Sequence, residues 1–226
     1  MSFHLLSPLL YMLFVKAITY IQPCPQSNNM KTLRKYHNIC LSFLSLVMLV
    51  GITYGTYYDN KFNSINHLFC LQYSENPITY YSVYLFLYSK YLEWGDTLFL
   101  HLSGKPITTL QYTHHMSTAL LVYVHAREFI SPLVFLYQGL NCLVHVPMYL
   151  YFAYPKGFLY KFRKNITQFQ IYQHIICIIS TIYIKTLDNC EQNKYGLELG
   201  LSLYFMYLFY FSIFYIKSYN KKKKTL

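Results

Sequence analysis

The sequence predicts an all-α integral membrane protein, and three observations support this prediction. Hydrophobic residues make up 54% of the chain and charged residues only 12%, about half of the charged fraction of an ordinary soluble domain. The apolar residues gather into long continuous blocks instead of alternating with polar ones, which favours helices over a β-barrel. Each block approaches the roughly 20 residues that a helix needs to cross a bilayer.

Seven apolar blocks are predicted to form transmembrane helices. The gaps between them leave little room for another folded unit, so residues 1–226 are expected to form a single membrane domain. The blocks cover residues 3–21, 39–57, 78–102, 109–125, 129–153, 166–187 and 197–216.

The distribution of lysine and arginine predicts the orientation of these helices. Most of the basic residues fall in the segments 21–38, 103–108 and 154–165 and in the tail 217–226, all on one side of the membrane. Because cytoplasmic segments are enriched in Lys and Arg, the C-terminus is expected in the cytosol and the N-terminus in the lumen. The final KKKKTL has the form of a dilysine signal for the endoplasmic reticulum membrane. A simple stop-transfer cluster of charge is the alternative.

The formal net charge of +11 mainly reflects this asymmetry. A nucleic-acid-binding protein would need a basic surface with stacking aromatic side chains, and no segment of the sequence has that form. Nucleic acid is therefore not expected as a partner, whereas the lipid bilayer is.

The third block contains the charged segment KYLEWGDT. Lys90, Glu93 and Thr97 share one face of the expected helix, and Asp96 lies close to that face. Ionisable residues inside a bilayer are rare and usually face a cavity or each other. One cation and two carboxylates are therefore expected to form a compact buried network, which serves either structure or an active site.

The fourth block carries Gln111, His114 and His115 at helical spacing on one face. A single buried histidine usually hydrogen-bonds a backbone carbonyl and does nothing more. An adjacent pair, preceded by a third polar side chain, instead favours a functional site, because imidazoles exchange protons near neutral pH.

Polar residues also repeat at helical spacing in the fifth and sixth blocks. They are Asn141, His145, Met148, Tyr149, Thr167, Gln170, Gln173 and His174. Polar side chains of this kind commonly hold membrane helices together. Combined with the two preceding blocks, however, they predict a bundle with a wet or substrate-filled interior. The sequence has no serine nucleophile elbow, glycine-rich phosphate loop or CxxC pair.

These motifs resemble those of the ELO family of very-long-chain fatty acid elongases. The resemblance runs from about Met30 through HNICLSFLS at 37–45 to the tail, and four motifs occur in the order of the family. KxxExxDT matches Lys90, Glu93, Asp96 and Thr97. An HxxHH-like box ends in His114 and His115. NxxxHxxMYxY matches Asn141, His145, Met148, Tyr149 and Tyr151, and TxxQxxQ matches Thr167, Gln170 and Gln173.

The resemblance implies an acyltransferase, a 3-oxoacyl-CoA synthase. Such an enzyme condenses a long-chain acyl-CoA with malonyl-CoA and releases carbon dioxide and CoA. It also implies seven helices, six of which form an inverted barrel around a substrate tunnel. No bound cofactor and no metal are expected. The expected partners are the reductases and the dehydratase of the elongation cycle and a second copy of the chain. A disulfide is expected between Cys70 and Cys190, the two cysteines on the predicted lumenal side.

The resemblance also gives roles to individual residues. His114 is the candidate acyl carrier, through an acyl-imidazole, because imidazole can attack a thioester. His115 and His145 are expected to move protons or stabilise the enolate. The histidines are expected to be positioned by Lys90, Glu93 and Asp96. The expected substrate-binding side chains are Gln111, Asn141, Tyr149, Thr167, Gln170 and Gln173. The expected contacts for CoA phosphates are Lys105, Lys161, Arg163 and Lys164.

Gln111 stands where the family's box has its first histidine. Glutamine forms hydrogen bonds but does not titrate, so the enzyme is active if this position only orients its neighbours. Some algal elongases that act on polyunsaturated chains have glutamine there, which implies such a specificity here. The alternatives are a catalytically dead elongase-like partner subunit and, with less support, a membrane di-iron desaturase or hydroxylase. The latter needs more clustered histidines than this chain has. A seven-span receptor or transporter is a further alternative, although no internal repeat is seen.

Overall fold

The computed structural model describes residues 3–60, 76–128, 133–187 and 194–219, and every regular element in these ranges is helical. The all-α prediction is therefore confirmed. Short 3-10 helices cover Phe3–Leu6 and Phe158–Phe162. The α-helices are α1 (Ser7–Ile18), α2 (Asn28–Asn60), α4 (Pro77–Leu92), α5 (Trp94–Leu102), α6 (Thr109–Glu128), α7 (Leu133–Ala153), α8 (Arg163–Lys185) and α9 (Lys194–Tyr219).

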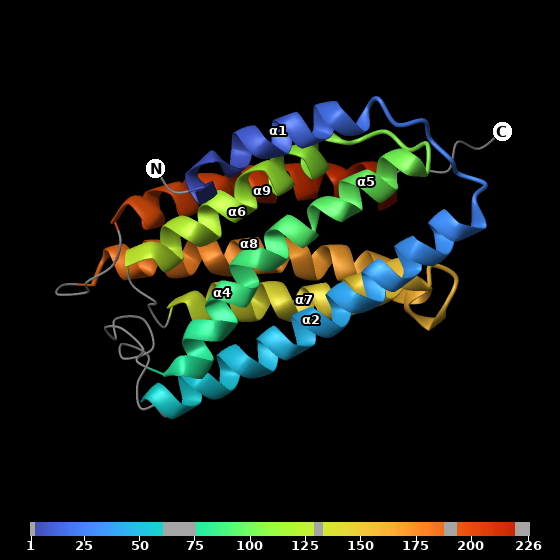
Figure 1. Ribbon diagram of the computed structural model, residues 1–226. Coiled ribbons are helices and arrows are strands. Elements are labelled where there is room, and N and C mark those ends of the chain that lie inside the picture. Colours follow the sequence, from blue (N-terminus) through green and yellow to red (C-terminus); the bar gives the residue numbers. More distant parts are fainter. Residues whose placement is uncertain (1–2, 61–75, 129–132, 188–193, 220–226) are drawn as a thin grey trace.

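The helices pack as a closed ring with one helix outside it. Helix α2 contacts α4, α4 contacts α6, α6 contacts α9, α9 contacts α8, α8 contacts α7, and α7 contacts α2 again. Helix α5 extends the course of α4, and α1 lies outside the ring against α6 and α5 (Figure 1). In this arrangement, side chains from segments far apart in the sequence can meet in the interior.

The third predicted block is not one continuous helix, because it breaks at Glu93 between α4 and α5. The N–H of Asp96 donates to the carbonyl of Glu93, three residues back, where an α-helix would use the fourth. A Cβ on Gly95 would come 2.6 Å from Cε1 of His37. Glycine at this position therefore allows α5 to approach α2 closely.

Helix α5 ends in a Schellman turn at Gly104, whose φ is 67°. The N–H of Lys105 donates to the carbonyl of Leu100, and the N–H of Gly104 donates to that of His101. Glycine adopts this left-handed backbone without a steric cost. The turn ends α5 just before Lys105 and begins the short connection to α6.

Several helices extend beyond the apolar blocks that predicted them. Helix α2 begins at Asn28, so residues 28–38, which were expected in a cytosolic loop, are helical. Helices α8 and α9 likewise begin three residues before their blocks, at Arg163 and Lys194. Hydropathy reveals only the apolar part of a helix, and the polar first turns of these helices carry no such signal.

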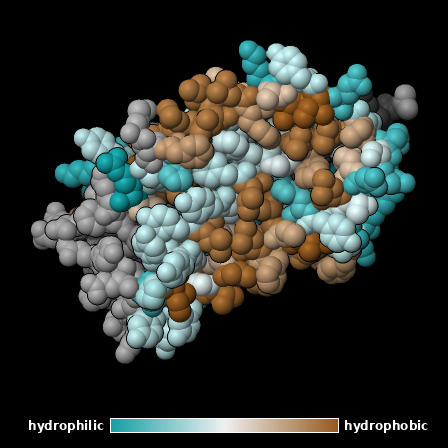
Figure 2. Space-filling model, in the orientation of Figure 1, coloured by the Kyte–Doolittle hydropathy of each residue, from teal (hydrophilic) through white to brown (hydrophobic). Residues whose placement is uncertain are grey.

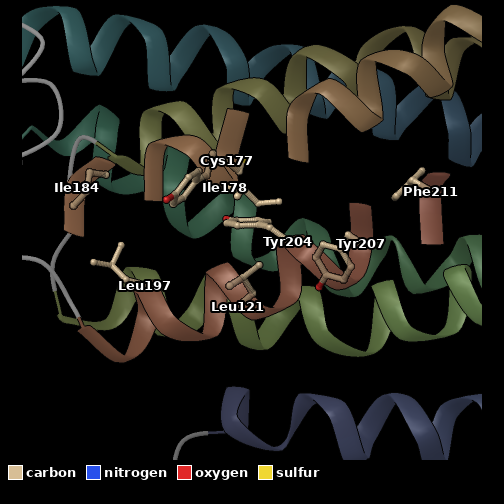
Figure 3. Packing of buried hydrophobic residues seen from close by; sticks show 9 residues of the cluster. Leu121, Cys177, Ile178, Ile184, Leu197, Tyr204, Tyr207 and Phe211 are labelled. Carbon is tan, nitrogen blue, oxygen red and sulfur yellow. The ribbon is translucent and has the colours of Figure 1, made fainter. Parts of the chain in front are cut away.

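A hydrophobic cluster joins α8 and α9 to α6. Cys177 and Ile178 of α8 pack with Tyr204 and Tyr207 of α9, and Leu121 of α6 completes this group (Figure 3). The cluster fixes the positions of three neighbouring helices of the ring.

The outer surface carries many large hydrophobic side chains, among them Phe43 and Phe209. Figure 2 shows hydrophobic side chains over the middle of one face and hydrophilic ones toward the end where α2 begins and α5 ends. Within the described ranges, Asn28–Tyr58 and Lys194–Tyr219 are long and apolar enough to cross a membrane, and Phe3–Ile18 is a shorter apolar helix. Exposed apolar surface of this extent indicates a membrane protein.

Two predictions lie outside the described residues. These are the disulfide between Cys70 and Cys190 and the lysine-rich tail at 221–224. Both remain predictions.

Candidate functional site

A cavity of about 670 Å³ lies inside the ring and reaches the end where α2 begins and α5 ends. Its volume is in the range of small-molecule sites. Its walls come from α2, α5, α6, α7, α8 and α9. The predicted site residues that line it are Glu93, Asp96, Lys105, Gln111, His114, His115, Asn141, His145, Tyr149, Arg163, Thr167, Gln170 and Gln173.

Lys90 forms the centre of a buried polar network beside this cavity. Its Nζ lies 2.8 Å from Oε1 of Glu93 and 2.9 Å from Oδ1 of Asn141. The amide Nδ2 of Asn141 is 3.2 Å from Nε2 of His145, and Nδ1 of that ring is 3.7 Å from Oε1 of Glu93. Since the side chains of Lys90 and Glu93 are at most 3% exposed, each charge depends on the other for compensation.

Asp96 does not join the network of Lys90, which corrects the expectation of one cation shared by two carboxylates. Its Oδ1 lies 2.9 Å from Nε2 of His37 on α2, and its Oδ2 accepts a hydrogen bond of 2.8 Å from the hydroxyl of Tyr149. The helix break at Glu93 turns the two carboxylates toward different neighbours. His37 belongs to none of the four motifs, and its only sequence signal is its place in HNICLSFLS.

Thr97 and Gln111 are joined by a hydrogen bond, and Thr97 also reaches the helix outside the ring. The amide Nε2 of Gln111 donates to Oγ1 of Thr97 over 3.3 Å, and the same oxygen lies 2.8 Å from the hydroxyl of Tyr11 on α1. Thr97 therefore faces α1 and α6, whereas Lys90 and Glu93 face α7. The expectation that Lys90, Glu93 and Thr97 share one face assumed an unbroken helix and was wrong.

His114 and His115 lie next to each other at the cavity wall, with their rings nearly perpendicular. Nδ1 of each ring is buried and has no hydrogen-bond partner among the described residues. The ring of His114 also packs against Tyr207 and Phe211 of α9. Packing thus fixes the ring of His114, while no described side chain bonds its Nδ1.

Helix α8 contributes a polar stripe to the cavity wall. Nε2 of Gln170 lies 3.2 Å from Sδ of Met148, while Thr167 donates to the carbonyl of Arg163 on its own helix. Gln173 and His174 are buried farther along the same stripe. The TxxQxxQ spacing therefore places its side chains on one cavity-facing side.

The basic residues divide into two groups. Lys105 and Arg163 line the cavity, whereas Lys161 and Lys164 are exposed and lie outside its lining. Arg34, which the sequence analysis did not assign to the site, also lines the cavity, and its Nη1 donates to Oγ of Ser103 over 3.0 Å. Arg34 was not predicted because it belongs to none of the four motifs and reaches the cavity only through the packing of α2.

A smaller cavity of about 60 Å³ lies deeper in the ring. His114, Asn141, Gln173 and His174 line both cavities, so these residues form the boundary between them. Lys90 faces only the smaller cavity.

In the described ranges, no group of three or more His, Cys, Asp or Glu side chains is arranged to hold a metal ion.

A ring of apolar helices around a histidine-lined cavity defines a helical membrane protein with an internal site. The profile of the ELO family, described as the GNS1/SUR4 family, matches residues 1–226. The chain belongs to this family.

Several curated relatives carry elongase names. The chain is 31% identical to very long chain fatty acid elongase 4 of Trypanosoma cruzi, over 62% of this chain and 52% of the relative. It is 30% identical to fatty acid elongase 2 of the same organism, over 63% and 55%. It is 28% identical to fatty acid elongase A of Dictyostelium discoideum, over 84% and 74%. The matches thus span between about half and three quarters of the length of these relatives.

Proposed function

We propose that the protein is a fatty acid elongase that condenses a long-chain acyl-CoA with malonyl-CoA, giving 3-oxoacyl-CoA, carbon dioxide and free CoA. Membership of the ELO family and the names of the relatives support this activity. The observation that carries the chemistry is the meeting of His114, His115 and His145, from two helices, at one cavity.

In the first half of the proposed reaction, a ring nitrogen of His114 attacks the thioester carbonyl of the acyl-CoA. The carbon–sulfur bond breaks, CoA leaves as the thiol after taking up a proton, and the acyl group remains as an acyl-imidazole. The unpartnered Nδ1 and the packed ring of His114 support this role. A ring held in place by packing need not break a hydrogen bond before it reacts.

In the second half, malonyl-CoA loses carbon dioxide, and the resulting enolate attacks the acyl carbonyl and expels the imidazole. The reaction needs groups that stabilise the enolate oxygen and transfer protons. His115 and His145 take these roles, and Lys90, Glu93 and Asn141 hold the ring of His145 in position. Asp96 positions Tyr149 at the cavity wall.

The larger cavity accommodates the CoA end of the substrates in this scheme. Arg34, Lys105 and Arg163 supply positive charge for the phosphates. The remaining polar residues bind the thioester and the pantetheine arm: Gln111, Asn141, Tyr149, Thr167, Gln170 and Gln173. The acyl chain then extends past His114 toward the smaller cavity.

The proposal also includes the placement of the protein. The seven spans are α1, α2, α4 with α5, α6, α7, α8 and α9, in the endoplasmic reticulum membrane. The N-terminus is lumenal and the C-terminus cytosolic, and the ring of helices is the inverted barrel. A second copy of the chain, the reductases and the dehydratase of the elongation cycle are the proposed partners.

A catalytically dead partner subunit is the alternative, because Gln111 replaces a histidine of the family box. The contact of Gln111 with Thr97 supports an orienting role, which a neutral amide performs without titrating. This contact supports the proposal of an active enzyme over a partner subunit.

Expression in yeast tests the proposed activity. Cells are fed saturated, monounsaturated and polyunsaturated acids in turn, and their fatty acids are profiled for products that are two carbons longer. Such products are expected with the native chain and with His101→Ala, a histidine outside the cavity lining, but not with His114→Ala. The preferred feed tests the polyunsaturated specificity. If no feed is elongated although the protein accumulates in the reticulum, the partner-subunit alternative takes the place of the enzyme.

A further inference from the structure

The smaller cavity combines apolar walls with polar atoms that have no partner. Leu121, Val83 and Cys177 contribute apolar surface. Oγ1 of Thr118, Nε2 of His125, Oε1 of Gln138 and Nδ1 of His174 are buried there without a hydrogen bond among the described residues. Buried polar groups are almost always paired, so a concentration of unpaired ones at one cavity points to a missing partner.

The geometry around Gln138 identifies its free atom as an acceptor. Its Nε2 lies 3.2 Å from the carbonyl of Ser82 and 2.8 Å from the hydroxyl of the same residue. A carbonyl only accepts, so the amide nitrogen of Gln138 must point toward it. The side chain is fully buried, and its oxygen Oε1 has no donor within the part of the chain that the structure describes.

His125 presents a second acceptor to the same cavity. Its Nδ1 lies 2.9 Å from the carbonyl of Leu121, so Nδ1 must carry the proton. In the neutral ring Nε2 is then a bare acceptor. It has no partner among the described residues. Helices α6 and α7 therefore each present one unpaired acceptor to the cavity.

An unsubstituted acyl tail cannot satisfy these atoms, because a hydrocarbon has no polar hydrogen to donate. Leaving buried acceptors unpaired against hydrocarbon is costly. A hydroxyl group would donate one hydrogen bond, and its oxygen could accept another from Thr118. The apolar surface of the cavity would pack against the methylene groups on either side of that hydroxyl.

We infer that the smaller cavity is a binding site for a hydroxyl group carried far along the acyl chain, so that the protein accepts hydroxylated acyl chains. This inference rests on the proposed function, in which the acyl group is held at His114. His125 lies three turns farther along α6, roughly 16 Å away, so the hydroxyl is near the end of the chain that is remote from the thioester. An ordered water offers the same O–H donor and is the other possible source of this chemistry.

Binding to the purified protein in detergent tests the inference without requiring catalysis. Saturated fatty acids of increasing length are compared with their ω-hydroxy derivatives. At the length that reaches the cavity, the hydroxy acid is expected to bind about threefold to tenfold more tightly than its parent, as one net hydrogen bond allows. The double variant Gln138→Leu/His125→Phe, which removes both acceptors, is expected to abolish most of this preference. Each single variant leaves one acceptor for the hydroxyl proton and is expected to reduce the preference less.

Ser180→Ala is the matched control. Ser180 is also a buried polar residue of the ring, but its hydroxyl donates to the carbonyl of Ile176 and it lines neither cavity. This variant is expected to keep the preference for the hydroxy acid. Thr118→Val, which is nearly isosteric, gives a milder test if the two other variants fail to fold.

Equal affinity for hydroxy and parent acids at every length means that the cavity holds water only, and this overturns the inference. A preference that keeps its full size in the double variant Gln138→Leu/His125→Phe and in Thr118→Val overturns it as well. The elongation assay separates the two claims: elongation of plain acids without a hydroxyl preference leaves the proposed function standing. A hydroxyl preference without any elongation removes the proposed function and keeps the binding site.

Discussion

Lys90 connects two helices that are far apart in the sequence. From α4 it places its ammonium group 2.9 Å from the amide oxygen of Asn141 on α7, while the same group pairs with Glu93 at 2.8 Å. Because Asn141 in turn contacts His145, the ion pair and a candidate catalytic ring belong to one buried unit.

Replacing Lys90 is expected to destabilise the fold. Lys90→Met leaves the carboxylate of Glu93 buried without a cation, at a cost of about 3–5 kcal/mol in the free energy of unfolding. Lys185→Met is the control, since Lys185 and Glu198 form an ion pair that is 39% and 64% exposed and is worth about 1 kcal/mol or less. Thermal unfolding in detergent measures both, and equal losses would refute the buried-pair argument. The double variant Lys90→Met/Glu93→Gln, which removes both charges, is expected to recover part of the lost free energy of unfolding.

The contact between Gln111 and Thr97 predicts non-additive effects on activity. Gln111→Leu removes this hydrogen bond and is expected to lower the elongation rate several-fold, since a neutral bond is worth about 1 kcal/mol. Thr97→Val removes the same bond together with the contact to Tyr11, so it is expected to lower the rate further. The double variant is expected to be little worse than Thr97→Val alone. Thr113→Val is the control, because that hydroxyl bonds only its own helix. Fully additive losses would show that Gln111 acts independently of Thr97.

His37 is expected to act on the reaction through Asp96. His37→Phe removes a bond to a carboxylate, worth about 1.5–3 kcal/mol, and is expected to lower kcat between about tenfold and a hundredfold while KM for acyl-CoA changes little. Tyr149→Phe removes the other partner of Asp96 and is expected to lower kcat in the same direction. His101→Gln changes a histidine that bonds the carbonyl of Ile21 outside the cavity and serves as the control. An unchanged kcat in His37→Phe would exclude the role of His37.

The division among the basic residues predicts which of them bind CoA. Lys105→Gln and Arg163→Gln are expected to raise KM for acyl-CoA about threefold to tenfold, because both side chains line the cavity. Lys161→Gln and Lys164→Gln remove the same charge outside the lining and are expected to have little effect. Added salt is expected to reduce the difference in KM between the native chain and the Lys105→Gln and Arg163→Gln variants, since partly exposed charges are screened. Equal effects of all four substitutions would indicate general electrostatic attraction instead of a binding site.

Much of the fold could be predicted from the sequence, because long apolar blocks leave few alternatives to helices. The start of α2 could not be predicted, since its first turns are polar and carry no hydropathy signal. The break at Glu93 was also missed. Apolar residues lie on both sides of Glu93 within the block 78–102, so hydropathy carries no signal of the break.

The candidate site was predictable where one helix face carries several polar residues, as with Gln111, His114 and His115. It was less predictable where a residue acts alone. Arg34 and His37 stand in a segment that hydropathy assigns to a loop, and Gln138 and His125 belong to no motif. Only the packing of the ring brings Arg34, Gln138 and His125 to the two cavities and His37 to the carboxylate of Asp96.

The hydrogen bond between Tyr11 and Thr97 predicts correlated sequence changes within the family. Because the hydroxyls of Tyr11 and Thr97 and the amide of Gln111 form one chain of hydrogen bonds, a change at one position alters what the other two tolerate. Positions 11, 97 and 111 are therefore expected to covary across homologues, even though α1 stands outside the ring. If an alignment shows that these three positions vary independently, substitutions in α1 are not coupled to those in the active site.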